Sequence, residues 1–409
     1  MLKRLLTAAV VCVACWMAWA SLRVGAARFV AEHALRVNAP RESELAAGLA
    51  PSDPDAQFAR AWLLSNAGDT GGALQAYERA LALRPSDYLL WLEMGKVRER
   101  AGDVEGALAA FREAARLAPS YAQPRWQLGN ALLRAGSREE AFTELRRAAE
   151  SDPALYPNML QAVWHGSGKD ARAFVRAASP RTTDETLAVV KLLIKEGAPD
   201  EGLKLLRESG AQLAEESRKK LAADLIAAEA FTDAYAVWSE GRGAIGSLTD
   251  GGFDEGARSD EEGFGWRFAR DVQNVKLSLD TDAPREGARS LKVEYAGNSE
   301  PATPAVSRLV AVEPGALYRL TFSARTKELV TGGPPFVQIV SAAKSGEALA
   351  ETAVLPDSTN GWQEFALEFK APAAGAVRVA LSRKPCASAP CPAFGGVWLD
   401  AFELRRIER

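Results

Sequence analysis

The stretch that decides the fold is residues 88–121, YLLWLEMGKVRERAGDVEGALAAFREAARLAPSY. It contains Pro119, and prolines stand 34 residues to either side, at Pro85 and Pro153. Glycine and alanine keep the same spacing, at Gly68, Gly102 and Gly136, at Ala73, Ala107 and Ala141, and at Ala80, Ala114 and Ala148. A fixed period of this length is typical of stacked helix pairs and not of a compact enzyme fold.

The residue types explain the period. Glycine adopts a positive φ at little cost, so the repeated glycines are expected to end the first helix of each pair. Alanine has a small side chain, so the repeated alanines let neighbouring helices approach closely. Proline cannot continue a helix, so the repeated prolines end the second helix of each pair. The pattern therefore predicts an α-solenoid.

Residues 54–87, 88–121 and 122–155 resemble three units of the tetratricopeptide repeat. The middle unit has the residues that this family prefers at Trp91, Met94, Gly95, Gly102, Ala107, Phe111, Ala114 and Pro119. The other two units depart from the family at Gln57, Ala61 and Leu145. The resemblance implies a solenoid whose groove binds another protein or a peptide.

The helical pattern extends beyond these three units, over residues 39–242. A short helix is expected at 42–49, and helix pairs at 183–210 and 222–240. Residues 154–182 are the least regular part, because Gly166, Gly168 and Pro180 interrupt the pattern. We expect an array of five or six pairs in which the irregular outer pairs act as caps.

The first 22 residues form a different kind of segment. Lys3 and Arg4 precede an apolar run, Leu5–Leu22, without charge, glycine or proline. A membrane-spanning helix needs roughly 17–25 residues, so one interpretation is an anchor with its start in the cytoplasm. A signal peptide cleaved after Ala20 is the alternative, since residues 18–20 (Ala-Trp-Ala) form a small-x-small site. Both place the rest of the chain outside the cytoplasm, either as a single-pass protein of the bacterial inner membrane facing the periplasm or as a secreted protein.

From residue 248 the hydrophobic pattern changes from a helical period to a period of two. Apolar and polar residues alternate at residues 291–295, 318–325, 365–369, 377–381 and 398–402. Proline and glycine cluster between these runs. Short alternating strands with such turns predict an antiparallel β-sandwich over 248–409, which follows a glycine-rich linker at 243–247.

Residues 248–409 resemble the jelly-roll carbohydrate-binding modules of the galactose-binding-like superfamily. The resemblance rests on four stretches: DGGFDEG at 250–256, GFGW at 263–266, REGARSL at 285–291 and VWLDAFEL at 397–404. It implies a sandwich that binds polysaccharide. Sugars bind to aromatic faces and planar polar side chains, and the candidates are Trp266, Arg325, Gln338 and Trp362. The alternative for Trp362, which follows Asn360 and Gly361 at a strand start, is a role in the core.

In many modules of this family a structural calcium ion ties the first strand to the last. The resemblance places its carboxylate ligands at Asp254 and Asp400. Calcium takes six to eight oxygen ligands, and Ala401 stands where the family has a further aspartate. The alternative is that both aspartates are hydrogen-bonded turn and edge residues. No other cofactor is predicted.

Cys386 and Cys391 flank a proline-rich loop. Disulfides form and persist in export compartments. We therefore expect these two cysteines to form a disulfide that closes the loop.

The sequence favours a non-catalytic protein. It has two histidines, His33 and His165, and contains no H-E-x-x-H, G-x-S-x-G or phosphate-loop motif. The net charge of −3 gives no attraction to nucleic acid. We expect a membrane-tethered periplasmic adaptor that binds a protein or peptide and a polysaccharide, in envelope or exopolysaccharide assembly. The alternative is a pure interaction scaffold whose sandwich binds no sugar.

Overall fold

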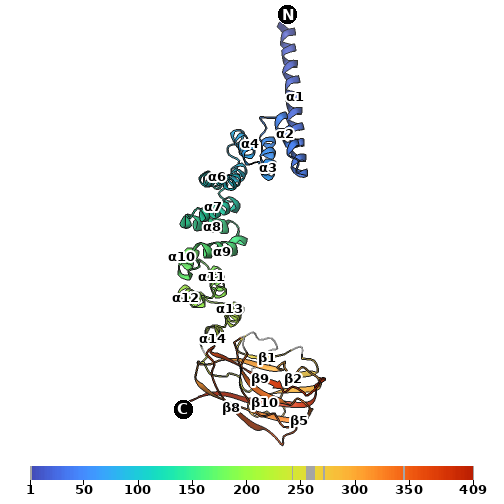
Figure 1. The fold of residues 1–409 in the computed structure, drawn as a ribbon, viewed down its shortest axis with the longest axis vertical. Coiled ribbons are helices and arrows are strands. Elements are labelled where there is room, and N and C mark those ends of the chain that lie inside the picture. Colours follow the sequence, from blue (N-terminus) through green and yellow to red (C-terminus); the bar gives the residue numbers. More distant parts are fainter. Residues whose placement is uncertain (1, 242, 255–262, 270–271, 344–345, 409) are drawn as a thin grey trace. The chain divides into compact units, whose positions relative to one another are not determined.

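The computed structural model describes residues 2–241, 243–254, 263–269, 272–343 and 346–408 (Figure 1). Within these ranges the chain is helical as far as Trp238 and forms β-strands from Trp266 onward, which confirms the predicted fold class. It folds into two compact units, Met1–Pro180 and Arg181–Arg409. The units do not coincide with the change from helix to strand, since the last four helices belong to the second unit.

The helices follow one another as antiparallel pairs. Those of the first unit are α1 (Leu2–Val37), α2 (Pro40–Leu49), α3 (Pro54–Asn66), α4 (Thr70–Leu83), α5 (Tyr88–Arg100), α6 (Val104–Leu117), α7 (Ala122–Arg134), α8 (Arg138–Ser151), the short 3-10 helix η1 (Pro153–Leu155), α9 (Tyr156–Gly166) and α10 (Ala171–Ala178). Those of the second unit are α11 (Thr183–Lys195), α12 (Pro199–Ser209), α13 (Glu215–Ala227) and α14 (Phe231–Trp238).

Local capping explains where the repeated helices begin and end. Four successive helices, α3 to α6, begin after an aspartate whose carboxylate accepts a backbone N–H two or three residues later, at 2.8–3.0 Å: Asp53, Asp69, Asp87 and Asp103. The helix ends carry the repeated glycines at positive φ, with 85° at Gly68, 81° at Gly102 and 83° at Gly136. The 34-residue period therefore reflects the repetition of residues that begin and end helices.

Close packing explains a glycine inside the first helix of two repeats, at Gly95 and Gly129. A Cβ atom at Gly95 would lie 2.6 Å from the ring of Phe111, and one at Gly129 would lie 2.7 Å from Leu145. Because these glycines have no side chain, the large residue of the second helix packs directly on the backbone of the first.

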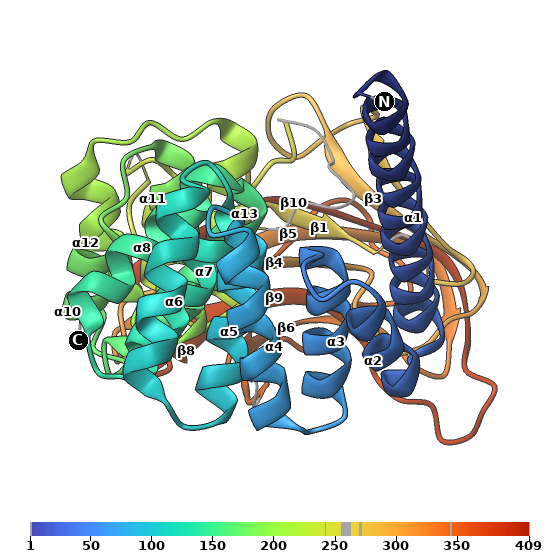
Figure 2. The same ribbon diagram turned by 90° about the horizontal axis from the view of Figure 1, so that it is seen from above.

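The helix α1 has two parts with different surroundings. Its first part is apolar and exposed, as at Trp16 (65% exposed) and Leu22 (74%). Its second part packs on α2 and α3 (Figures 1 and 2). Ala27, Ala31 and Ala34 are buried in this part, and Ala31 shares a cluster with alanines of α2 and α3. Among the described residues, α1 is the single helix that is both long enough and apolar enough to cross a membrane. The helix expected at 42–49 is α2, and it pairs with the second part of α1.

The irregular stretch at 154–182 also forms a helix pair, which the sequence pattern did not single out. The ring of Trp164 on α9 packs edge-on against Phe174 on α10, with 5.4 Å between the ring centres. Counting α1 with α2, the described residues form seven pairs in place of the expected five or six.

Over the described residues, the β-sandwich consists of two five-stranded antiparallel sheets. The strands are β1 (Trp266–Phe268), β2 (Val275–Asp280), β3 (Ser290–Asn298), β4 (Val306–Ala311), β5 (Leu317–Thr331), β6 (Pro335–Ser341), β7 (Ala348–Glu351), β8 (Gln363–Lys370), β9 (Ala376–Arg383) and β10 (Pro392–Ile407). One sheet has the order β1-β4-β9-β6-β7 and is called sheet A here. The other has the order β2-β3-β10-β5-β8 and is called sheet B.

Alternation along the strands fills the core between the sheets, as predicted for most runs. The run at 398–402 is different. Val397 and Leu399 are buried in the core, so Trp398 lies on the outer face of sheet B. The pairing of β10 with β5 shifts between Asp400 and Glu403, with Ala401 at a φ of 54°, and this irregularity returns Phe402 to the core.

Within the second unit, the outer face of sheet A packs against the helices α11–α14. Leu309 and Ala311 on β4 and Ala376 on β9 share one buried cluster with residues of these helices, including Tyr235. The Tyr235 ring packs edge-on against Phe264, at 5.0 Å. The last helix pairs and the sandwich therefore share a hydrophobic core.

Candidate functional site

The first helices of successive pairs in the first unit are joined by arginine contacts. Arg100 on α5 donates to Ser65 Oγ on α3, and Arg134 on α7 donates to Glu99 Oε1 on α5 through Nε at 3.0 Å. Both contacts span 35 residues and so repeat with the units. We call the surface formed by α3, α5, α7 and α9 the first-helix face.

A cavity of about 470 Å³ opens on the first-helix face between α7, the start of α8 and α9. Its polar lining residues are Asn130, Arg134, Arg138, Gln161 and His165, and Leu133, Ala162 and Gly166 complete it. Arg134 is paired with Glu99, so Arg138 carries the remaining positive charge among the lining residues. His165 Nδ1 lies 2.8 Å from the carbonyl oxygen of Gln161, which fixes the ring against its own helix. The cavity offers hydrogen-bond donors and positive charge to a partner.

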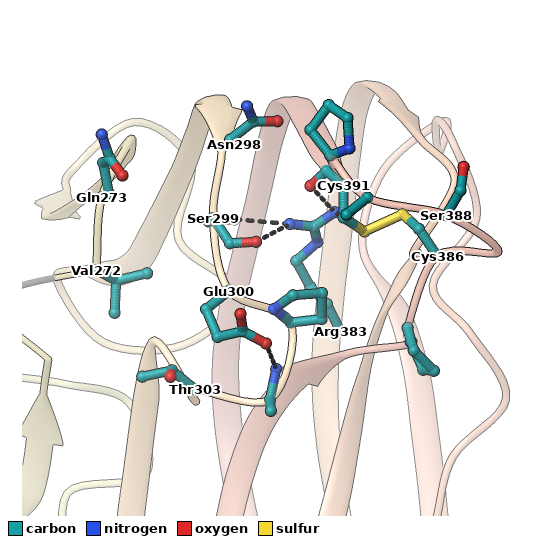
Figure 3. A pocket seen from close by; sticks show the side chains of 15 residues that line it. Val272, Gln273, Asn298, Ser299, Glu300, Thr303, Arg383, Cys386, Ser388 and Cys391 are labelled. Atoms are coloured by element: carbon teal, nitrogen blue, oxygen red, sulfur yellow. Dashed lines mark hydrogen bonds between the residues drawn. A yellow bond between two sulfur atoms is a disulfide. The ribbon is translucent and has the colours of Figure 1, made fainter.

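A larger pocket, of about 710 Å³, lies between loops at one end of the sandwich (Figure 3). Arg383 is 6% exposed and points between the loop that carries Ser299 and the loop that carries Cys391. It donates to Gly333 O at 3.0 Å, to Ser299 Oγ at 2.6 Å and to Cys391 O at 3.1 Å. Burial lowers the pKa of this guanidinium. Arg383 thus ties three loops together.

The rim of this pocket is polar and held by a disulfide. Cys386 and Cys391 are bonded to each other and close the loop between β9 and β10. Gln273, Asn298 and Ser388 stand around the opening (Figure 3). None of the described residues that line the pocket is aromatic, so they present no flat apolar face on which a sugar ring could stack.

Asp254 and Asp400 approach the same turn, the one before β3. Asp400 is fully buried, and its Oδ2 accepts backbone N–H groups of Arg285 at 2.7 Å and Glu286 at 3.2 Å. Its Oδ1 accepts the N–H of Ala401 at 2.7 Å. Asp254 Oδ1 accepts the N–H of residue 288 at 2.8 Å. The two carboxylates therefore clamp the turn to the first and last segments of the sandwich.

In the structure these carboxylates serve as hydrogen-bond acceptors. Three of the four carboxylate oxygens of Asp254 and Asp400 face backbone N–H groups, whereas a cation needs oxygen lone pairs. The described residues contain no group of three or more His, Cys, Asp or Glu placed to hold a metal. Burial raises the pKa of Asp400, although its backbone hydrogen bonds act in the opposite direction. Glu255 and Gly256, at the end of the opening motif, lie outside the described residues, as does Arg242 at the predicted end of the solenoid.

Of the four predicted sugar-binding residues, Trp266 and Gln338 lie away from Arg325 and Trp362. Trp266 is 5% exposed, donates to Asp250 O at 2.8 Å and packs against Phe253 and Phe402, so its ring belongs to the core. Gln338 is on β6 of sheet A, where it donates to Ser382 Oγ at 2.7 Å. Neither can share a sugar with a residue on the outer face of sheet B.

The other two predicted residues meet on sheet B. The Arg325 guanidinium lies 5.3 Å from the ring centre of Trp362 and 4.7 Å from that of Trp398. Lys292 lies 5.2 Å from the Trp398 ring. The four side chains form a row across the sheet in which cations and rings alternate. Lys292 and Trp398 were missed, because nothing in the sequence shows that β3, β10 and β5 are neighbours.

Asp280 on β2 completes this row. Its Oδ2 accepts from the indole N–H of Trp398 at 2.5 Å and lies 3.8 Å from Arg325 Nη2. Burial alone would raise the pKa of Asp280, but the hydrogen bonds from Trp398 and from the N–H of Asp282, with the charge of Arg325, lower it on balance. The row is therefore fixed by hydrogen bonds and charge on the outer face of the sheet.

Comparison with protein families identifies the repeats. Residues 54–97 match the family model described as tetratricopeptide repeat. No protein in the curated set matches the chain.

Several solved structures are similar to this chain over part of its length. A MamA double mutant (RS-1) has 21% identity and a TM-score of 0.34, over 42% of this chain and 94% of its own. Pseudomonas aeruginosa PilF has 16% identity and a TM-score of 0.34, over 47% and 95%. The CBM22-1 xylan-binding domain of Paenibacillus barcinonensis Xyn10C has 12% identity and a TM-score of 0.28, over 41% and 99%.

Proposed function

Because the chain carries tetratricopeptide repeats followed by a β-sandwich that resembles carbohydrate-binding modules, we propose that it is a non-catalytic, membrane-tethered adaptor of the bacterial periplasm. One observation carries the tether: α1 exposes an apolar segment and continues without a break into the first helix pair. Apolar side chains such as Trp16 and Leu22 are costly to leave in water, and a bilayer covers them.

The first-helix face is the surface for a protein or peptide partner. Its polar cavity presents Arg138, Gln161 and His165, which suit backbone carbonyls and carboxylates of a bound segment. The sandwich supplies the second surface, for a polysaccharide. Together the two surfaces suit a role in the assembly or export of an envelope polysaccharide.

A second candidate function is a pure interaction scaffold. The packing of helices on the outer face of sheet A favours it, because Leu309, Ala311 and Ala376 are used for that contact. In this case the sandwich serves to cap the solenoid and binds no sugar. Glycan binding by the whole chain separates the two candidates.

Removal of the apolar segment is expected to release the protein from membranes. Residues 23–409 keep the buried alanines of α1, so this variant should fold and be soluble. The full chain should stay with the membrane fraction after carbonate washing, because a spanning helix is not extracted by high pH. N-terminal sequencing is the control: a mature protein that begins at Ser21 would show that the segment is a cleaved signal peptide.

A photo-crosslinker on the first-helix face is expected to capture the partner. Placed at Gln161, which lines the cavity, it should give one discrete adduct in cells. Placed at Arg116, which is exposed on α6 and pairs with Glu113 on the same helix, it should give none. Equal labelling from both positions, or no adduct from either, would contradict the assigned surface.

A further inference from the structure

The outer face of sheet B carries a slot along β10. Because Ala393, Val397 and Leu399 point into the core, Phe394, Gly396 and Trp398 lie on the outer side. Phe394 is 48% exposed, and Gly396, the next outward position along the strand, has no side chain. The edge of the Trp398 ring lies over Gly396, and both residues line a cavity. Phe394 stands beside this cavity, because it pairs with Ala296, which also lines it. We call the cavity the β10 slot.

Steric contacts explain why Gly395 and Gly396 have no side chain. Gly395 has a φ of 101°, and a Cβ atom there would lie 2.3 Å from the carbonyl oxygen of Glu328. A Cβ atom on Gly396 would lie 2.8 Å from the outer edge of the Trp398 ring. Any side chain at Gly396 would therefore displace the indole or fill the slot.

Charged residues flank the slot in register. Gly396 is opposite Glu294 on β3 and opposite Lys327 on β5, and Glu294 is in turn opposite Lys276 on β2. These residues, with Lys292, Glu328 and Trp398, line one cavity of about 700 Å³. The cavity is thus built from four adjacent strands and suits an extended chain.

The charges of the lining are unequal. Three lysines, Lys276, Lys292 and Lys327, face two glutamates, Glu294 and Glu328. Lys292 forms an ion pair with Glu294 at 2.8 Å, so these two charges offset each other. The remaining charges of the lining are those of Lys276 and Lys327, on either side of Gly396, and of Glu328. The slot therefore favours a ligand that combines hydroxyl groups with carboxylates.

We infer that the β10 slot binds an internal segment of an acidic polysaccharide. A sugar ring lies against Phe394, a ring carboxylate pairs with Lys327, and hydroxyl groups hydrogen-bond to Glu328. The inference rests on the proposed polysaccharide-binding function and assigns it to the face of the sandwich opposite the one that packs on α11–α14.

The test measures binding of the full chain in detergent to polygalacturonate, with xylan as the neutral probe. Lys327→Glu should weaken polygalacturonate binding at least tenfold, because it replaces the positive charge beside Gly396 by a negative one. Phe394→Ala should weaken it to a similar extent. Lys370→Glu is the matched control: Lys370 is exposed on β8 of the same sheet and does not line the cavity, so its change should stay within twofold. Unchanged melting temperatures show that the variants are folded.

The outcomes separate this inference from the proposed function. Loss of binding in both slot variants, with the control unchanged and with weaker binding at higher salt, supports the β10 slot. Polysaccharide binding that neither slot variant weakens, or equal binding of xylan and polygalacturonate, overturns the inference and leaves a sugar-binding sandwich. No binding of either probe overturns the inference and favours the pure scaffold.

Discussion

Replacing Asp400 by alanine is expected to destabilise the β-sandwich by about 3–5 kcal/mol. The carboxylate is fully buried and accepts three backbone N–H groups, those of Arg285, Glu286 and Ala401. A buried donor left without an acceptor costs about 1–3 kcal/mol, and these three hydrogen bonds are partly buried. Urea denaturation followed by tryptophan fluorescence measures the loss. Asp282→Ala, an exposed residue near the same turn, is the control and should change stability by less than about 0.5 kcal/mol.

Melting curves of the wild type and of Asp400→Ala, recorded in calcium and in chelator, test whether Asp254 and Asp400 bind a calcium ion. The hydrogen-bonded clamp requires no metal, so the wild-type curves in calcium and in chelator should coincide. A higher melting temperature in calcium, lost in Asp400→Ala, would instead mean that Asp254 and Asp400 bind the ion and give up their N–H partners. A hundredfold excess of ligand over its dissociation constant would then add about 2.7 kcal/mol.

Ala107→Trp is expected to unfold the middle repeat, with a loss of about 3 kcal/mol or more. Ala107 is 1% exposed and lies in a cluster with Leu92, Phe111 and Leu128, so the cluster has no space for an indole ring. Far-UV circular dichroism should show a lower melting temperature and less helix.

The control for this prediction is Ala109→Trp, two residues along the same helix on its exposed side. It adds the same side chain at a position where water can be displaced freely. If both variants melted like the wild type, the register of the repeats given above would be wrong.

Much of the solenoid was predictable from sequence because its signals are local. An aspartate that caps a helix, as at Asp87, and a glycine that ends one, as at Gly102, act within a few residues of their own position. The pair α9 and α10 was missed for the same reason: its glycines and proline break the period that the prediction relied on. Tertiary contacts such as Trp164 with Phe174 hold it together.

The sandwich face was less predictable because it depends on pairing between distant strands. Alternation placed Trp398 with Phe402, whereas the irregularity at Ala401 sends the two rings to opposite sides of the sheet. Arg325 and Trp362 were selected as single residues, and only the order of the strands shows that Trp398 lies beside Arg325. A period of two gives the face of a residue within its strand but not its neighbours across the sheet.

The unbroken α1 helix fixes the rotation of the apolar segment about the helix axis. Each residue of an α-helix turns the chain by 100° and advances it by 1.5 Å. Because Ala27, Ala31 and Ala34 fix one side of α1 against α2 and α3, the side of the apolar segment that continues this line is fixed as well. One residue inserted at Gly25 would rotate the apolar segment by about 100° about the helix axis relative to the first helix pairs. In the proposed membrane tether, the surface of α1 that meets the bilayer would therefore be fixed in rotation as well as in position relative to the first repeats.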